Sequence, residues 1–206
     1  MGSLIGIFRA LIRAMNAARL RWMSLLLWPV SAVANAPAAA PAPIERYEVR
    51  LPVSEFRAGA ARTTVAAAEP NVLSLATDYS HYAQFIKAFE ASKVVGRAGK
   101  TTDVYLRVKI LKGAATIWAV VRFEAPERDG GEETITAHMV KGNVKRLDAI
   151  WHLRAVDAGH TRVALELLIV PDLPVPEPLV VPEVRDAAAT AVRGLRDEAE
   201  RRFSAN

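Results

Sequence analysis

Four histidines are the residues whose side chains could act as an acid, a base or a metal ligand near neutral pH: His81, His138, His152 and His160. They do not occur at paired positions on a helix, and the sequence contains no cysteine, so the pattern does not predict a metal site. Ser80 precedes His81, but adjacent residues do not give the aligned nucleophile and base that acyl transfer requires.

The sequence therefore assigns no catalytic residue, and His138 and His152 are the two candidates that an enzyme would use. Both lie in segments where polar and apolar residues alternate, so each side chain points either into an interior or out to water. No glycine-rich phosphate loop follows a predicted strand, and no cofactor is predicted.

The segments that must position these residues show a two-residue period, most clearly in residues 103–110. The expected inward-facing residues are Val104, Leu106, Val108 and Ile110; Ile117, Ala119, Val121 and Phe123; Ile135, Ala137 and Met139; Trp151, Leu153 and Ala155; and Val163, Leu165, Leu167 and Ile169. The gaps between these segments are too short for a crossover helix, so neighbouring strands should be antiparallel.

After a proline-rich segment, residues 171–182, the spacing of apolar residues changes to three and four. This spacing predicts an amphipathic helix over residues 182–203, with one apolar face formed by Val184, Ala188, Val192, Leu195, Ala199 and Phe203. Such a helix buries its apolar face by packing on the sheet. The predicted fold class is α+β, a curved antiparallel sheet of about six or seven strands wrapped around a long C-terminal helix.

The net charge is concentrated at the N-terminus. The chain has 206 residues and a formal net charge of +5; without Arg9, Arg13, Arg19 and Arg21, 23 basic residues remain against 22 acidic ones, a net charge of +1. This balance lacks the basic footprint expected for phosphate binding, so a nucleic-acid partner is not predicted.

Residues 1–36 have the form of an export signal or an N-terminal membrane segment, with an arginine-bearing start and an apolar run over residues 23–33. Cleavage near Ala34 would give a periplasmic or secreted protein; the alternative is an uncleaved membrane anchor. Met15 is an alternative start. Residues 37–60 are predicted to be an Ala/Pro-rich tether and extended lead-in, and residues 61–204 the folded domain.

Three features together resemble the START-like superfamily (SRPBCC), and within it the polyketide cyclase/dehydrase and coenzyme Q-binding branch. They are the segment VLSLATDYSHYAQFI at residues 72–86, the pair of segments WHL at 151–153 and GHTRV at 159–163, and the proline-rich entry to the last helix. The resemblance implies a helix-grip fold around an apolar cavity for lipids, quinones or polyketides. Asp78, Tyr82 and Phe85 match the family's Asp, Tyr and Phe pattern and are interpreted as a cap and as packing residues.

The residues expected to line the cavity come from the inward strand positions and the apolar helix face: Leu106, Val108, Ile135, Ala137, Met139, Trp151, Leu165, Leu167, Val192 and Leu195. The alternative is that the same residues fill a solid core, because both use the same residue types.

The leading functional hypothesis is a noncatalytic protein that binds a hydrophobic small molecule. The alternatives are a cyclase, dehydrase or hydrolase that uses His138 or His152, and a protein-interaction module. Peripheral membrane contact through the helix arginines Arg193, Arg196, Arg201 and Arg202 also stays open, although interleaved acidic residues make a solvated face the commoner use of such a cluster.

Overall fold

The alternating segments form one antiparallel sheet. The computed structural model describes residues 40–51, 54, 56–110 and 115–203. Its strands are β1 (Glu45–Val49), β2 (Ala58–Val65), β3 (Phe89–Ala98), β4 (Thr101–Ile110), β5 (Ala115–Phe123), β6 (Glu127–Asp129), β7 (Glu132–Gly142), β8 (Arg146–Ala155) and β9 (Thr161–Val170). Their order is β1-β2-β9-β8-β7-β5-β4-β3, and β6 pairs with β7. Every paired strand runs antiparallel to its neighbour.

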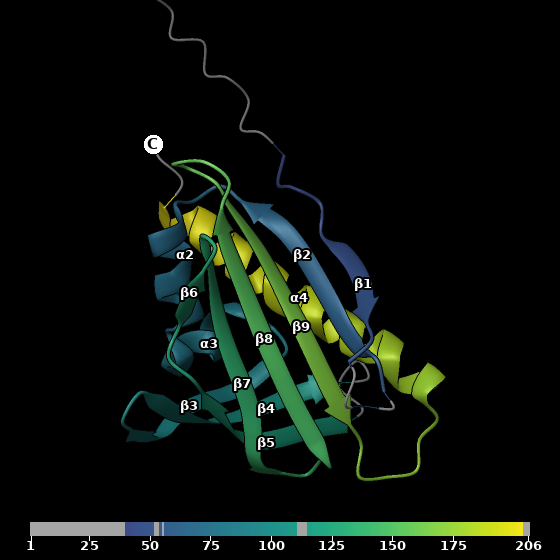
Figure 1. The fold of residues 1–206 in the computed structure, drawn as a ribbon. Helices are drawn as coiled ribbons and strands as arrows, with labels where there is room; N and C mark the ends of the chain where they lie inside the picture. Colours follow the sequence, from purple (N-terminus) through teal and green to yellow (C-terminus); the bar gives the residue numbers. More distant parts are fainter. Residues whose placement is uncertain (1–39, 52–53, 55, 111–114, 204–206) are drawn as a thin grey trace, which may run out of the picture. The chain divides into compact units, whose positions relative to one another are not determined.

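The C-terminal helix α4 (Glu177–Phe203) packs on β2 and β9. Figure 1 shows this helix behind β2 and β9, while β3, β4 and β5 run crosswise to β7, β8 and β9. The short helices α2 (Glu69–Ala76), η1 (Tyr79–His81) and α3 (Tyr82–Phe85) contact β3, β8 and α4. The predicted α+β fold class, a curved antiparallel sheet around a long C-terminal helix, is therefore confirmed.

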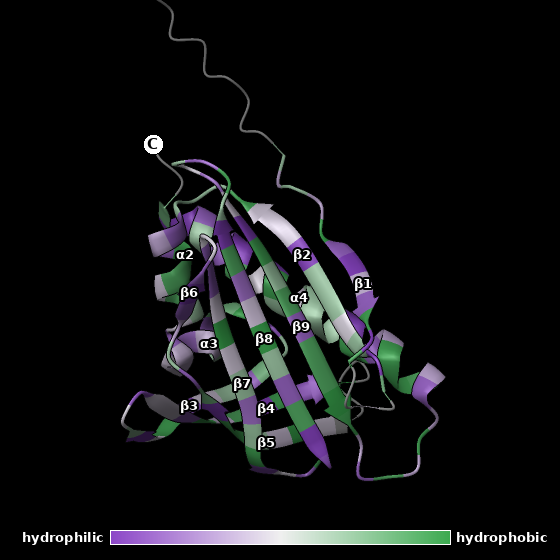
Figure 2. Ribbon diagram, in the orientation of Figure 1, coloured by the Kyte–Doolittle hydropathy of each residue, from purple (hydrophilic) through white to green (hydrophobic). Residues whose placement is uncertain are grey.

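The inner face of the sheet forms the core, as the two-residue period predicts. Val104, Ile135, Leu153 and Val163 are each 0% exposed. Along β8, Figure 2 shows hydrophobic and hydrophilic residues in alternation. Ala155, also expected to face inward, is exposed where β8 ends.

The sheet has nine strands, and four of them were not predicted from the period. Strand β2 is buried at almost every position, so it lacks the alternation. Strand β1 has largely exposed residues and lies within the stretch expected to be tether and lead-in. Strand β6 has three residues. Strand β3 contains irregularities at Phe89/Ala91 and Val94/Gly96, which interrupt the alternation.

Helix α4 begins at Glu177, five residues before the predicted start. Pro178 lies in the first turn, where a missing N–H costs no helical hydrogen bond. Pro182 lies inside the helix, yet Val180, Val181 and Val184 around it are buried. Their burial offsets the lost bond, so the proline does not mark the helix start.

The apolar face of α4 is as predicted, with Ala188, Val192 and Ala199 fully buried. Arg196 differs from the prediction, because it is only 8% exposed. Its guanidinium donates to the Ala42 carbonyl oxygen at 2.7 Å and pairs with Asp197 at 2.6 Å. Arg196 therefore attaches the segment before β1 to the helix and is not part of a solvated face.

The predicted leader, residues 1–36, lies outside the described residues. Among the residues that are described, no helix is both long and apolar enough to cross a membrane.

Candidate ligand cavity

An apolar cavity of about 90 Å³ lies between α4 and the inner face of the sheet. Strands β4, β5, β8 and β9 form one wall, and Ala187 and Ala191 of α4 form the opposite side. Tyr82, Ile86 and Phe89 line it from α3 and the start of β3. A cavity of roughly 10–15 Å³ holds a single water, so this space is larger than an ordinary packing defect.

A second, wider cavity of about 300 Å³ adjoins the first. The two share Ile110, Ile117, Ile169 and Ala187 in their linings, so they lie side by side along these residues. The wider part reaches the loop between β9 and α4, where Leu173 is 73% exposed. The proline-rich segment, which the sequence predicts to be either the end of a strand or the lip of a cavity, therefore ends β9 and also lines this wider cavity.

Among the described residues that line the inner cavity, Tyr82 is the one with a titratable side chain. Its hydroxyl donates a hydrogen bond to the Ala76 carbonyl oxygen, and the side chain is 2% exposed. Burial raises the pKa of Tyr82 well above its ordinary value, with smaller contributions from Tyr79 and Asp78 in the same direction. The phenol is therefore neutral at physiological pH, and its proton is committed to the backbone.

Aromatic side chains close the inner end of the cavity. Tyr79 stacks on Phe123 with ring centroids 4.2 Å apart, and Tyr82 contacts Phe85, Phe89 and Phe123 edge to face. Tyr82 and Phe85 thus act as packing residues, as expected. Asp78 bonds the His81 ring, and no capping hydrogen bond from its side chain to η1 is found.

The structure divides the ten predicted lining residues into two groups. Leu106, Val108, Trp151, Leu165 and Leu167 line the inner cavity. The other five lie in the packed core beside it: Ile135, Ala137, Met139, Val192 and Leu195. Val192 and Leu195 flank Gly194, which lies against the backbone at the end of α3, and Ala187 and Ala191 are the residues of α4 that border the cavity.

Sequence reasoning also missed Ala119 and Ala149, which line the cavity from β5 and β8. Small side chains at inward strand positions are a signal that could have pointed to them, because they leave volume that a larger residue would fill.

Comparison with protein-family models gives a match over residues 65–196 to the family described as polyketide cyclase / dehydrase and lipid transport. The chain belongs to this family. No curated protein sequence matches the chain. The family match covers the sheet from the end of β2, the short helices and most of α4, which are the elements that enclose the cavity.

Solved structures of the same fold include proteins named for different functions. A STAR-related lipid transfer protein from Xanthomonas axonopodis is 19% identical, with a TM-score of 0.64 over 76% of this chain and 93% of that one. A START superfamily protein from Mycobacterium smegmatis is 17% identical, with a TM-score of 0.63 over 70% and 97%. The Zhui aromatase/cyclase from Streptomyces sp. R1128 is 16% identical, with a TM-score of 0.59 over 78% and 96%. At these identities the likeness shows the fold alone.

In this member of the family, His138 and His152 do not face the cavity. The period that turns Ala137 and Trp151 inward turns both histidines to the outer face. His152 Nδ1 lies 2.8 Å from Glu132 Oε1, and His138 Nδ1 lies 3.9 Å from Glu124 Oε1. Neither can act as a base on a molecule inside the cavity.

The described residues contain no group of three or more His, Cys, Asp or Glu side chains placed to hold a metal ion. His81 and His160 pair locally with Asp78 and Asp157 in turns.

Proposed function

We propose that this protein binds a hydrophobic small molecule, of the lipid, quinone or polyketide type, in the cavity between α4 and the sheet. The observation that carries the proposal is the apolar inner cavity between α4 and the sheet, with a wider space beside it at the β9–α4 loop. Moving an apolar ligand from water into such a space is favourable by roughly 25 cal/mol per Å² of apolar surface removed from water.

The arrangement of polar groups favours an amphiphile with its polar end at the mouth. In the described lining of the inner cavity, the one titratable group is the committed hydroxyl of Tyr82. The wider part is lined also by Asp172, Glu183 and Asn143. An apolar chain therefore fits the inner part, and a polar group fits the outer part, where water reaches it.

Binding is favoured over catalysis because the inner cavity offers no base. A cyclase or dehydrase must move a proton at a carbon or oxygen of its substrate, which needs a positioned acid or base. The two histidines considered for that role are on the other face of the sheet, and Tyr82 keeps its proton. The likeness to an aromatase/cyclase at 16% identity shows the fold alone and does not supply the missing group.

The test is native mass spectrometry of the protein after gentle extraction from its native host. A co-purified apolar molecule is expected, and it should be lost from the variant Ala149→Phe, which fills the inner cavity. The matched control is Ala164→Phe on the neighbouring strand, where the residue pairs with His152 on the outer face. Equal ligand retention in both variants would overturn the proposal.

We also propose that the protein works outside the cytoplasm, on the support of its arginine-bearing start and apolar run. N-terminal sequencing of the protein from the native host should find a start near Asn35. An intact Met1 or Met15 would contradict this.

A further inference from the structure

The outer face of the sheet carries an apolar patch, although a face of this kind is usually polar. Its members, Val95, Tyr105, Trp118, Val120 and Val140, line a shallow hollow over β3, β4, β5 and β7. Val95 is 53% exposed, Trp118 36% and Val140 47%. The rings of Tyr105 and Trp118 stack with centroids 6.5 Å apart, so the hollow has an aromatic floor. We call these five residues the outer patch.

Two irregularities in the strand register create the exposed valines. The register of β3 with β4 shifts between Val94 and Gly96, which leaves Val95 without a partner. The register of β5 with β7 shifts where Val120 pairs with Lys141 and Val121 with Met139, which leaves Val140 unpaired. A bulge re-aims a side chain relative to the regular alternation. Here both bulges point a valine into the same hollow.

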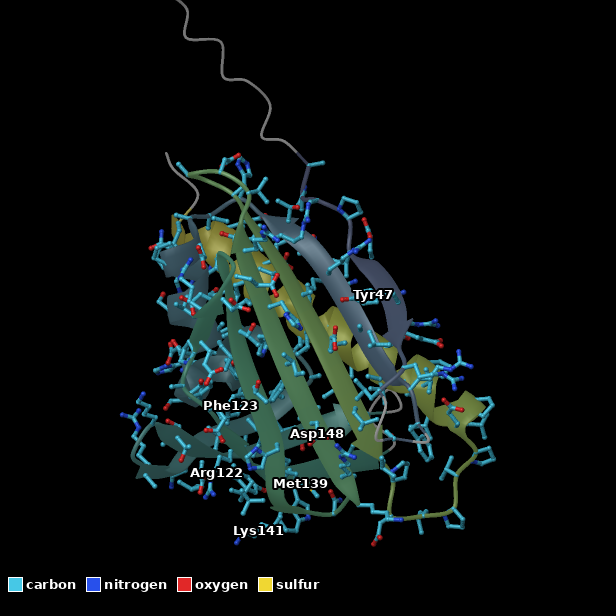
Figure 3. All side chains as sticks on the ribbon, in the orientation of Figure 1. Tyr47, Arg122, Phe123, Met139, Lys141 and Asp148 are labelled. Atoms are coloured by element: carbon cyan, nitrogen blue, oxygen red, sulfur yellow. The ribbon has the colours of Figure 1, made fainter. Side chains whose placement is uncertain are left out.

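Basic side chains surround the outer patch. Residues paired directly across antiparallel strands share a face, so Lys93, Tyr105, Val120 and Lys141 form one row across the sheet, with a lysine at each end. Figure 3 shows Lys141 near the end of β7. Among the described residues neither lysine has an ion-pair partner. Three other cations of this face, Arg107, Lys109 and Arg122, are each paired with a carboxylate.

Two carboxylates of this face are paired with basic side chains. Glu90 Oε1 lies 2.9 Å from Lys109 Nζ, and Asp103 Oδ1 lies 2.7 Å from Arg122 Nε. Five basic residues, Lys93, Arg107, Lys109, Arg122 and Lys141, thus stand here against the three acidic residues Glu90, Asp103 and Glu124, although the chain beyond its first arginines is almost neutral. The local excess of positive charge, with two unpaired lysines, complements an anionic surface.

We propose that the outer patch binds the surface of an anionic lipid bilayer. Tryptophan and tyrosine place their rings at the headgroup level, where one edge is apolar and the other wet, and lysines beside them attract anionic lipids. Pairing of β3 with a strand of another molecule is opposed by its two bulges and by Lys93 at this edge of the sheet.

The outer patch also adjoins the mouth of the cavity. Asn143, which lines the mouth, accepts a hydrogen bond from the Trp118 backbone N–H at 2.8 Å. A bilayer held by the patch therefore lies next to the opening through which an apolar ligand would pass. The proposal itself does not depend on what the cavity holds.

The test uses environment-sensitive fluorophores on introduced cysteines, because the natural sequence has none. Val140→Cys places the label in the patch, and Val156→Cys is the matched control, since Val156 is 54% exposed in the turn between β8 and β9. Vesicles of phosphatidylcholine with phosphatidylglycerol should shift the emission of the label at 140 to the blue and leave the label at 156 unchanged. The double variant Lys93→Gln/Lys141→Gln should bind these vesicles at least tenfold more weakly.

A shift at neither position, an equal shift at both, or an equal shift with phosphatidylcholine alone would overturn the proposal. So would a dimer in analytical ultracentrifugation that Val140→Ser dissociates, because a second copy would then cover the patch. Ligand retention, measured separately by native mass spectrometry, tells whether the cavity proposal stands.

Discussion

The two flanks of α4 show opposite solutions to the same packing problem. On the flank that faces β2, the helix backbone touches the strand: a Cβ added at Gly59 would lie 2.3 Å from the backbone nitrogen of Arg185. On the flank that faces β4 and β5, Ala187 and Ala191 border an apolar cavity of about 90 Å³. Small residues therefore bring the helix close on one side and leave space on the other.

The comparison shows that a small side chain does not by itself determine whether a cavity forms. Beside Gly59 the strand is held by its register with β1 and β9, so the helix can approach until the backbones meet. On the other flank β3, β4 and β5 run crosswise to β7, β8 and β9, and the space beside the two alanines stays open. The cavity is the part of the interior that the curved sheet encloses without filling.

The largest effect on stability is expected on the flank where α4 touches β2. Gly59→Ala should lower the free energy of unfolding by about 3 kcal/mol, the upper end for overpacking, because the added carbon overlaps helix backbone that cannot move alone. Gly159→Ala is the control, since its Cβ would meet nothing nearer than Asp157 Oδ1 at 3.8 Å. Urea unfolding measures both; similar midpoints would show that the helix is not held against β2 as described.

The second effect is a loss of stability at high pH, and it comes from the buried phenols at the inner end of the cavity. Burial raises the pKa of Tyr79 from 10.0 to about 12. Between these pH values the unfolded chain loses a proton that the folded protein keeps, so the free energy of unfolding falls as the pH rises. The full shift of two pH units corresponds to about 3 kcal/mol from this residue, of which about 2 kcal/mol falls between pH 10 and pH 12, because each titration is only half complete at its own pKa.

Urea unfolding at pH 10 and pH 12 measures this loss, and Tyr79→Phe should show a smaller one than the natural protein. Tyr82, whose pKa is also raised by burial, acts in the same direction and remains in the variant. Equal losses in the two proteins would mean that Tyr79 is not buried as described.

On the cavity flank, a larger side chain should be tolerated. Ala187→Leu adds carbons to a residue that lines both parts of the cavity, so the free energy of unfolding should change by less than about 1 kcal/mol. Native mass spectrometry should show lower ligand occupancy. A destabilisation as large as that of Gly59→Ala would contradict the contrast between the flanks.

The smallest effect is expected on the outer face. His138→Gln and His152→Gln should leave ligand retention unchanged, because both side chains lie on the far side of the sheet from the cavity. His152 contributes modestly to stability through its 2.8 Å contact with Glu132. Loss of ligand in either variant would show that the outer face communicates with the cavity.

Most of the sheet and the long helix could be predicted from the sequence, because burial on one face imposes a period on the residues. Val104 and Leu106 on β4, or Ala188 and Val192 on α4, record the face that each element buries. Strands β1, β2, β3 and β6 could not be predicted from the period, because exposure, burial at almost every position, bulges and short length remove that record. The start of α4 was missed because tertiary burial of Val180 and Val181 outweighs the local effect of Pro182.

The candidate site was only partly predictable for a related reason. Inward-facing residues such as Trp151 and Ile135 have the same periodicity, yet one lines the cavity and the other is packed in the core. Their difference depends on which element lies opposite, and a period along one strand contains no information about that. The same holds for the outer patch, whose valines come from bulges that only the pairing of strands reveals.

The sequence by itself determined which side of each strand and helix is apolar, because that property repeats locally along the chain. Only the tertiary structure decided where α4 stops approaching the sheet, and hence where the hollow lies and which residues border it. The physical reason is that a cavity is a property of distances between elements far apart in the chain. Those distances follow from close contacts such as Gly59 against Arg185 and from the curvature of the whole sheet.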